Sequence, residues 1–340
     1  MKFFKSRKST LVKLAILLFL VTMLLFPGCA FRGASSGLLL WFNNVLPSLL
    51  PFIIVSNLIV RLNITRHISR VFYPVFGKIF GISREGCYPV VIGFLSGIPM
   101  GAKAAADLEA DRRISMEEGQ FLMSMCNNAS PMFIIGYISI TQLELPEIKY
   151  ALFAIIFGSA IIGAFIYRLL VFLRKPRRGK LQAASLTRQE ASMDTAAPLP
   201  GKAPRPGSFR FEMLDSSIMN GFEIVTRIGG YIILFSILAQ IMKESLPSSG
   251  IVKAFAMGIL EITTGISQIC STAAGIKTKI VLIAALTSFG GLSGIAQTKS
   301  VLQGSRLSIR SYLYARVIVA IVAFLLAVIY VNTLFTAGYH

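Results

Sequence analysis

A glycine-rich segment early in the chain carries residue types that could build a binding site. Residues 86–102 are uncharged between Glu85 and Lys103, yet they contain four glycines and two prolines. One straight helix over these residues would be only about 25 Å long, and Pro99 would remove a hydrogen bond in its middle. Broken backbone at membrane depth persists only inside protein or beside a wet cavity. We therefore predict a re-entrant helical hairpin.

A second segment, residues 280–298, repeats this pattern in the other half of the chain. Residues 292–296 (Leu-Ser-Gly-Ile-Ala) match residues 95–99 (Leu-Ser-Gly-Ile-Pro), and a lysine and an Arg-Leu-Ser or Arg-Ile-Ser tripeptide follow each of them. The internal repeat predicts a second re-entrant hairpin. Paired segments broken by glycine or proline in corresponding halves are the best sequence indication of a midplane site in a transporter.

A third interruption lies in the apolar stretch 119–143. Asn127, Asn128 and Ser130 are costly in hydrocarbon unless they find partners, and Pro131 frees a carbonyl one turn earlier. An unwound helix that faces the first hairpin would use all four residues. The alternative is a proline kink with polar side chains that hold neighbouring helices together.

Three charged residues could contribute to the same site. Glu261 is the only charge between Lys253 and Lys277, and an acid inside a membrane helix marks an ion or substrate path by default. We predict that it binds a coupling ion or proton, unless a shift in register places it near an interface. Lys103 and Lys299 could bind an anion, or they could extend to the lipid headgroups.

The elements that must position these residues are membrane helices. The 340 residues are 54% hydrophobic and 14% charged, a balance that soluble domains rarely show. Apolar stretches long enough to span a bilayer predict an all-α, polytopic membrane helix bundle. Its predicted helices cover 14–31, 33–60, 119–143, 150–173, a short 228–242 extended backward through Phe222, 254–276 and 317–340. Residues 68–81 are either an interfacial helix or a loop.

A basic, proline-rich segment divides the chain. Residues 174–210 carry nine Lys or Arg, two acids and five prolines, so they cannot bury enough apolar surface to fold. We predict an N-terminal membrane helix (1–34), a first half (35–173), a cytoplasmic linker (174–210) and a second half (211–340). The two halves are pseudo-repeats, each with a re-entrant hairpin and a broken helix.

Several classes of function find no support in the composition. The net charge of +19 is spread over short tracts between apolar runs, which favours cytoplasmic loops and anionic lipid headgroups over nucleic acid. The four cysteines are far apart and only two histidines are present, so we predict no metal and no cofactor. Cys29 follows a faint lipoprotein-like box, but we interpret the segment as an uncleaved helix. No catalytic set stands out, so an enzyme is not expected.

Three motifs resemble a known family. Residues 93–103 (Gly-Phe-Leu-Ser-Gly-Ile-Pro-Met-Gly-Ala-Lys), 126–134 (Cys-Asn-Asn-Ala-Ser-Pro-Met-Phe-Ile) and 288–297 (Ser-Phe-Gly-Gly-Leu-Ser-Gly-Ile-Ala-Gln) resemble the YlbJ family of sporulation integral membrane proteins. This family belongs to the nucleoside-recognition or Gate group, which is distantly similar to concentrative nucleoside transporters. By this resemblance the substrate-binding residues are Ser96, Gly97, Pro99, Gly101, Lys103, Asn127, Asn128, Ser130, Pro131, Ser293, Gly294, Gln297 and Lys299.

The resemblance implies a transporter for a small anionic metabolite, dipicolinate, moved during sporulation across the mother-cell-derived outer forespore membrane. The alternative is a non-transporting scaffold or gate subunit of a sporulation membrane complex. Expected partners are the lipid bilayer, the small anion, and either a second copy of the chain or other sporulation membrane proteins. The family often has other side chains at Ile98 and at Gly294-Ile295, so the resemblance assigns no role to the side chains there.

Overall fold

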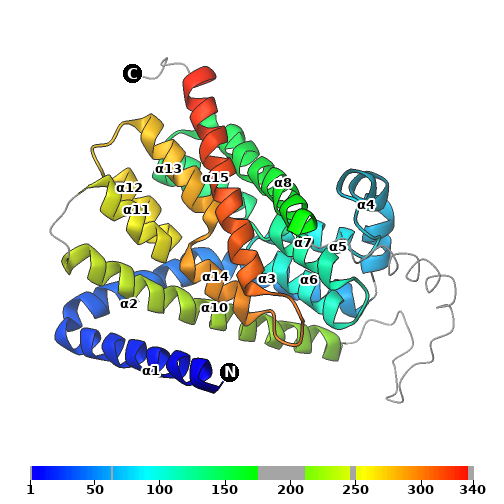
Figure 1. The fold of residues 1–340 in the computed structure, drawn as a ribbon, viewed down its shortest axis with the longest axis horizontal. Helices are drawn as coiled ribbons and strands as arrows, with labels where there is room; N and C mark the ends of the chain where they lie inside the picture. Colours follow the sequence, from blue (N-terminus) through cyan, green and yellow to red (C-terminus); the bar gives the residue numbers. More distant parts are fainter. Residues whose placement is uncertain (1, 63, 175–210, 246–249, 336–340) are drawn as a thin grey trace.

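The computed structural model describes residues 2–62, 64–174, 211–245 and 250–335 (Figure 1). Within these ranges all regular structure is helical and no strand occurs, which confirms the predicted all-α bundle. Four helices are long and apolar enough to cross a membrane, and a bent pair near the N-terminus makes a fifth candidate. The predicted linker lies, apart from Arg174, outside the described residues.

The N-terminal region bends earlier than the sequence predicted. Helix α1 (Lys2–Leu25) ends before Phe26, and α2 (Pro27–Leu40) continues through a π-helical turn (Trp41–Val45) into α3 (Leu46–Arg61). The bend is 107°. Pro27 cannot continue α1 but suits the first turn of α2. The predicted break at Arg32, between 14–31 and 33–60, is therefore wrong.

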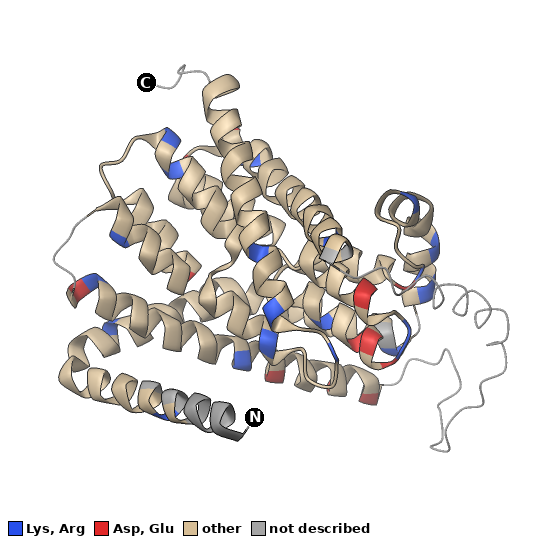
Figure 2. Ribbon diagram, viewed as in Figure 1, with Lys and Arg blue, Asp and Glu red and all other residues tan. Residues whose placement is uncertain are grey.

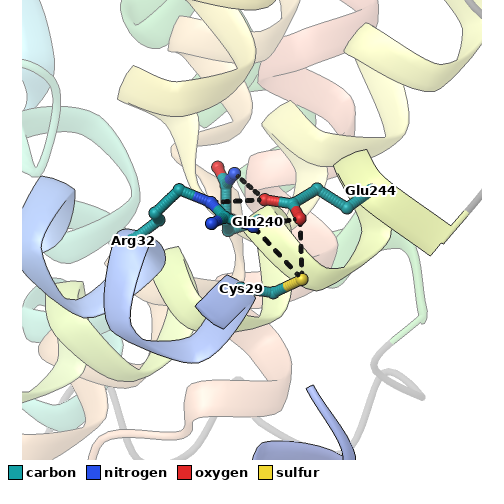
Figure 3. Close-up of polar contacts among 4 residues, drawn as sticks. All are labelled: Cys29, Arg32, Gln240 and Glu244. Atoms are coloured by element: carbon teal, nitrogen blue, oxygen red, sulfur yellow. Dashed lines mark hydrogen bonds and ion pairs between the residues drawn. The ribbon is translucent and has the colours of Figure 1, made fainter. Parts of the chain in front are cut away.

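Arg32 is tolerated inside α2 because a partner on another helix compensates its charge. Glu244, in the last turn of α10 (Phe211–Ser245), accepts hydrogen bonds from Arg32 Nη2 at 2.5 Å and from Arg32 Nε at 3.0 Å (Figure 3). The thiol of Cys29 donates to the same carboxylate at 2.7 Å. These contacts fasten α2 along α10, where a Cβ at Gly37 would lie only 2.9 Å from Ile233 Cα.

The first half contains a helical hairpin followed by a broken helix. Helices α5 (Cys87–Ser96) and α6 (Met100–Ala110) pack against each other, and a Cβ on Gly93 would lie 2.8 Å from Gly101 Cα. The next helix stops at Cys126 and resumes at Pro131, as predicted. In order, the remaining elements are α4 (Thr65–Phe80), α7 (Met116–Cys126), the π-helix η2 (Phe133–Gln142), the 3-10 turn η3 (Pro146–Ile148) and α8 (Lys149–Arg174).

The second half also contains a helical hairpin followed by a broken helix, but the hairpin does not lie where the sequence repeat predicted it. Helices α11 (Ile251–Leu260) and α12 (Ile262–Cys270) pack as a hairpin around Glu261, and a Cβ on Gly265 would lie 2.0 Å from Gly258 Cα. Helices α13 (Ile276–Phe289) and α14 (Gly291–Ser300) form one interrupted span. The predicted straight helix 254–276 and the predicted hairpin 280–298 are therefore both wrong.

Two kinds of glycine explain why the hairpin lies at Glu261 and why residues 280–298 do not reverse the chain. Gly258 and Gly265 let two short helices touch backbone to backbone, whereas Gly290 (φ +86°) ends α13 in a left-handed conformation without reversing the chain. Each half thus contains a hairpin, a broken helix and a long helix.

The last helix, α15 (Ile309–Thr333), packs against both α8 and α13, and the three lie side by side in Figure 1. Helix α10 runs along α2 and α3 on the other side of the bundle. Figure 2 shows the long helices uncharged over most of their length, with acidic residues gathered beside α6 and α7. Helix α4 settles the open choice for residues 68–81 in favour of a helix.

Candidate functional site

All four interruptions of the two halves meet at one cavity of about 890 Å³. The tip of the α5–α6 hairpin, the unwound segment after α7, the tip of the α11–α12 hairpin and the break between α13 and α14 each contribute lining residues. The π-helical turn before α3 forms another wall. From these elements, in order, the lining includes Ser96 and Ile98, Ala129 and Ser130, Glu261 and Thr263, Thr287, Gly290 and Ser293, and Asn43 and Pro47.

The tip of the first hairpin rests directly on the unwound segment. Gly97 has φ +83°, and a Cβ there would lie 2.7 Å from the backbone nitrogen of Ser130. One residue type satisfies both constraints, because glycine alone adopts this conformation freely and leaves room for the neighbouring chain. The carbonyl oxygen of Cys126 approaches the hairpin in the same way, 2.3 Å from a Cβ built on Gly93.

Asn127 holds the unwound segment to three helices. Its side-chain oxygen accepts from the backbone N–H of Ala102 in the first turn of α6 at 3.3 Å. Its nitrogen donates to Thr298 Oγ1 at 2.9 Å and to Tyr312 Oη at 2.8 Å. The side chain is fully buried, so these bonds replace those that water would make. Asn127 therefore positions the site and does not line the cavity.

Asn128 connects the same segment to a buried cation. Its nitrogen donates to the carbonyl of Met125 at 2.7 Å, and its oxygen accepts from Arg316 Nη1 at 2.7 Å. Arg316 lies in α15, is 0% exposed, and also donates through Nε to the carbonyl of Phe289 at 3.3 Å. The guanidinium thus joins both broken helices at the points where they are interrupted.

Glu261 is buried at the tip of the second hairpin, where it caps α12. Its carboxylate accepts from the backbone N–H groups of Thr263 at 3.2 Å and Thr264 at 2.7 Å, and from the hydroxyl of Thr264 at 2.9 Å. A negative charge at a helix N-terminus is stabilised by the orphan N–H groups and the helix dipole. Glu261 is therefore buried, but it lies at the break between α11 and α12 and not inside a continuous helix as predicted.

Three buried polar groups of this region have no hydrogen-bond partner within the protein. Ser96 and Thr287 are lining residues of the cavity with buried hydroxyl oxygens, and Arg316 Nη2 lies 3.9 Å from where a Cβ on the lining residue Gly290 would be. Unpartnered buried polar groups are costly and rare in proteins. Two hydroxyls and one guanidinium nitrogen therefore remain available to a polar ligand.

The structure brings some of the predicted binding residues together and leaves others outside. Six line the cavity, namely Ser96, Ser130, Glu261, Ser293, Gly294 and Gln297. Gly97, Pro99, Gly101, Asn127, Asn128 and Pro131 shape the hairpin and the broken helix around it. The two lysines lie elsewhere, since Lys103 pairs with Asp107 at 2.6 Å and Lys299 is exposed in the last turn of α14.

Thr287, Gly290 and Arg316 were not among the binding residues that the sequence predicted. The predicted helix 317–340 begins after Arg316, whereas α15 begins at Ile309 and Ser308 caps it by accepting from Ser311 N–H. Ser115, in the matching tripeptide, caps α7 in the same way. Recognition of Ser308 as a cap would have placed Arg316 about two turns inside a membrane helix.

Comparison with known proteins gives one curated relative. The chain is 26% identical to the sporulation integral membrane protein YlbJ of Bacillus subtilis (strain 168) over 361 aligned positions, which cover 98% of this chain and 85% of that protein. No family model and no solved structure matches the chain. The chain is an integral membrane protein, and this similarity confirms its resemblance to the YlbJ family that the three motifs indicated.

Proposed function

We propose that the protein is a membrane transporter for a small carboxylate anion, dipicolinate, which it moves during sporulation. The observation that carries the proposal is the meeting of two hairpin tips and two broken helices at one cavity that contains unpartnered polar groups. Discontinuous helices around a midplane site are the usual construction of secondary transporters. The cavity, at about 890 Å³, has a volume typical of sites for small molecules, roughly 300–1,000 Å³.

The chemistry of the cavity supports an anion. Breaks in helices present N–H groups at their new N-termini, which attract negative charge. The N-terminus of α12 is already capped by Glu261, whereas no side chain caps α14 at Gly290. Glu261 would repel a dianion directly, so in this proposal it binds a coupling proton or cation.

The proposal also covers the membrane in which the protein acts and its partners there. The name of the relative supports a role in sporulation. We place the protein in the mother-cell-derived outer forespore membrane, with the lipid bilayer and a small anion as its ligands. A second copy of the chain or other sporulation membrane proteins are its proposed macromolecular partners. We propose no enzymatic step, no cofactor and no nucleic acid.

Uptake by the purified full-length protein in lipid vesicles tests the proposal. We expect labelled dipicolinate to accumulate faster than in protein-free vesicles, and unlabelled dipicolinate to compete while the neutral pyridine-2,6-dicarboxamide does not. Arg310→Gln, which removes an exposed charge from α15, should leave uptake unchanged and serves as the control. A folded protein that gives no uptake above protein-free vesicles, yet binds other sporulation membrane proteins, would favour the scaffold function instead.

A further inference from the structure

We propose that Arg316 is the group that binds the carboxylate of the cargo, a role that deepens the transport function proposed above and rests on it. Five N–H bonds surround a guanidinium. In this protein Nε donates to Phe289 O and Nη1 to Asn128 Oδ1, and the Tyr312 ring lies 5.9 Å from the guanidinium carbon. Nη2 has no partner.

The charge of Arg316 also lacks a counter-ion. Among the described residues, no carboxylate forms an ion pair with Arg316. A fully buried cation without a carboxylate partner is destabilising unless something else compensates it. Both of its hydrogen bonds go to neutral carbonyl or amide oxygens, so a ligand carboxylate would supply the missing negative charge.

Gly290 separates Arg316 from the cavity. It lines the cavity, whereas Arg316 does not, and a Cβ placed on it would lie 3.9 Å from Arg316 Nη2. Ile98, at the tip of the first hairpin, covers the same residue, with its Cδ1 3.2 Å from that position. The route from the cavity to Nη2 therefore passes a residue without a side chain and the end of one flexible aliphatic chain.

The hydroxyls of Ser96 and Thr287 complete the polar set. Both line the cavity and have no partner, so each can donate to a second oxygen of a bound anion. Arginine suits such a site because its planar fork matches a carboxylate and it keeps its charge when buried. The ligand class that fits is a small organic carboxylate, in preference to a spherical inorganic anion.

Binding to the purified full-length protein in detergent tests this role. The ligands are pyridine-2,6-dicarboxylate, benzene-1,3-dicarboxylate, the neutral pyridine-2,6-dicarboxamide, chloride and phosphate. We expect the dicarboxylates to bind and the diamide to bind at least about tenfold more weakly, as loss of a charge-assisted hydrogen bond implies. Arg316→Gln should lose a similar factor for the dicarboxylates, Arg316→Lys should lose less, and Arg310→Gln should match the wild type.

The outcomes separate this role from the proposed cargo. Equal affinity of Arg316→Gln and wild type for dicarboxylates, equal binding of diamide and diacid, tighter binding of chloride or phosphate, or no binding of any anion would each overturn the assignment. If Arg316→Gln does not fold, two other measurements decide whether Arg316 binds the carboxylate. These are the affinities of the wild type for diacid and diamide, and the affinity of Arg316→Lys for the diacid. Binding of benzene-1,3-dicarboxylate through Arg316 without binding of dipicolinate would refute the cargo and leave the role of Arg316 intact.

Discussion

At the scale of single residues, the polar groups of the site divide into those that hold the backbone and those that face the cavity. Asn127 and Asn128 have bonded side chains and are fully buried, whereas the hydroxyls of Ser96 and Thr287 line the cavity without partners. A motif alone cannot separate these roles, because both use amide and hydroxyl side chains. Only the surrounding contacts do so.

Asn127 should contribute to stability more than to ligand contact. Asn127→Ala removes bonds to α6, α14 and α15 and leaves buried groups unsatisfied, so we expect a loss of roughly 2 kcal/mol or more in the free energy of unfolding. Thermal unfolding in detergent measures it. Asn332→Ala is the matched control, because Asn332 is exposed and bonds only within its own helix. Equal unfolding temperatures for the two variants would contradict the assignment.

Glu261 should stabilise the second hairpin through its cap. Glu261→Ala removes three acceptor bonds at the start of α12, and we expect a loss of about 1 kcal/mol. Glu261→Asp, a favourable capping residue, should recover part of that loss. Glu223→Ala, on the exposed side of α10, is the control, and a Glu261→Ala protein as stable as this control would refute the cap.

The coupling role of Glu261 is tested separately from its cap. Glu261→Gln keeps an acceptor but cannot carry a charge, so we expect uptake by this variant to differ from that of the wild type in rate and in pH profile. Vesicle uptake measured across a range of pH decides the matter. Unchanged rates and an unchanged pH profile would remove Glu261 from the transport cycle.

At the scale of elements, the sequence predicted three of the four broken segments, took the third for a hairpin and missed the fourth. The first hairpin and the unwound segment after Cys126 lie where Gly97, Pro99 and Pro131 indicated. The second hairpin, at Glu261, was missed because Gly258 and Gly265 are spaced as in an ordinary helix, and their close contact depends on a chain reversal. Sequence similarity between residues 95–99 and 292–296 does not mark equivalent positions in the fold.

The close contact within the second hairpin gives a direct test of that correction. A Cβ at Gly265 would lie 2.0 Å from Gly258 Cα, whereas a Cβ at Gly230, inside α10, would meet nothing within 4 Å. We expect Gly265→Ala to destabilise the protein by roughly 1–3 kcal/mol through overpacking. Gly230→Ala should be neutral or slightly stabilising, because alanine favours a helix. Similar unfolding temperatures would restore the straight helix that the sequence predicted.

At the scale of the whole molecule, two halves with the same order of elements both contribute residues to the lining of one cavity. The sequence predicted the two halves and a site between their interruptions, because glycine, proline and buried polar residues carry a local cost that stands out in apolar stretches. The sequence could not identify Arg316 as a residue of the site, because its guanidinium reaches Phe289 only through the packing of α15 against α13. Long-range packing of this kind leaves no local pattern.

The central claim is that these interruptions form one cavity that binds a small carboxylate. Ligand protection of single cysteines tests it most directly. In a chain whose four native cysteines are replaced by alanine, Ser130→Cys and Thr141→Cys, at lining residues that a reagent can reach, would be labelled with a small thiol reagent, with and without dipicolinate. Ser271→Cys, at an exposed residue outside the cavity lining, is the control. We predict that dipicolinate slows labelling at residues 130 and 141 in proportion to its occupancy and leaves residue 271 unaffected, whereas equal labelling with and without dipicolinate at all three positions would contradict the account.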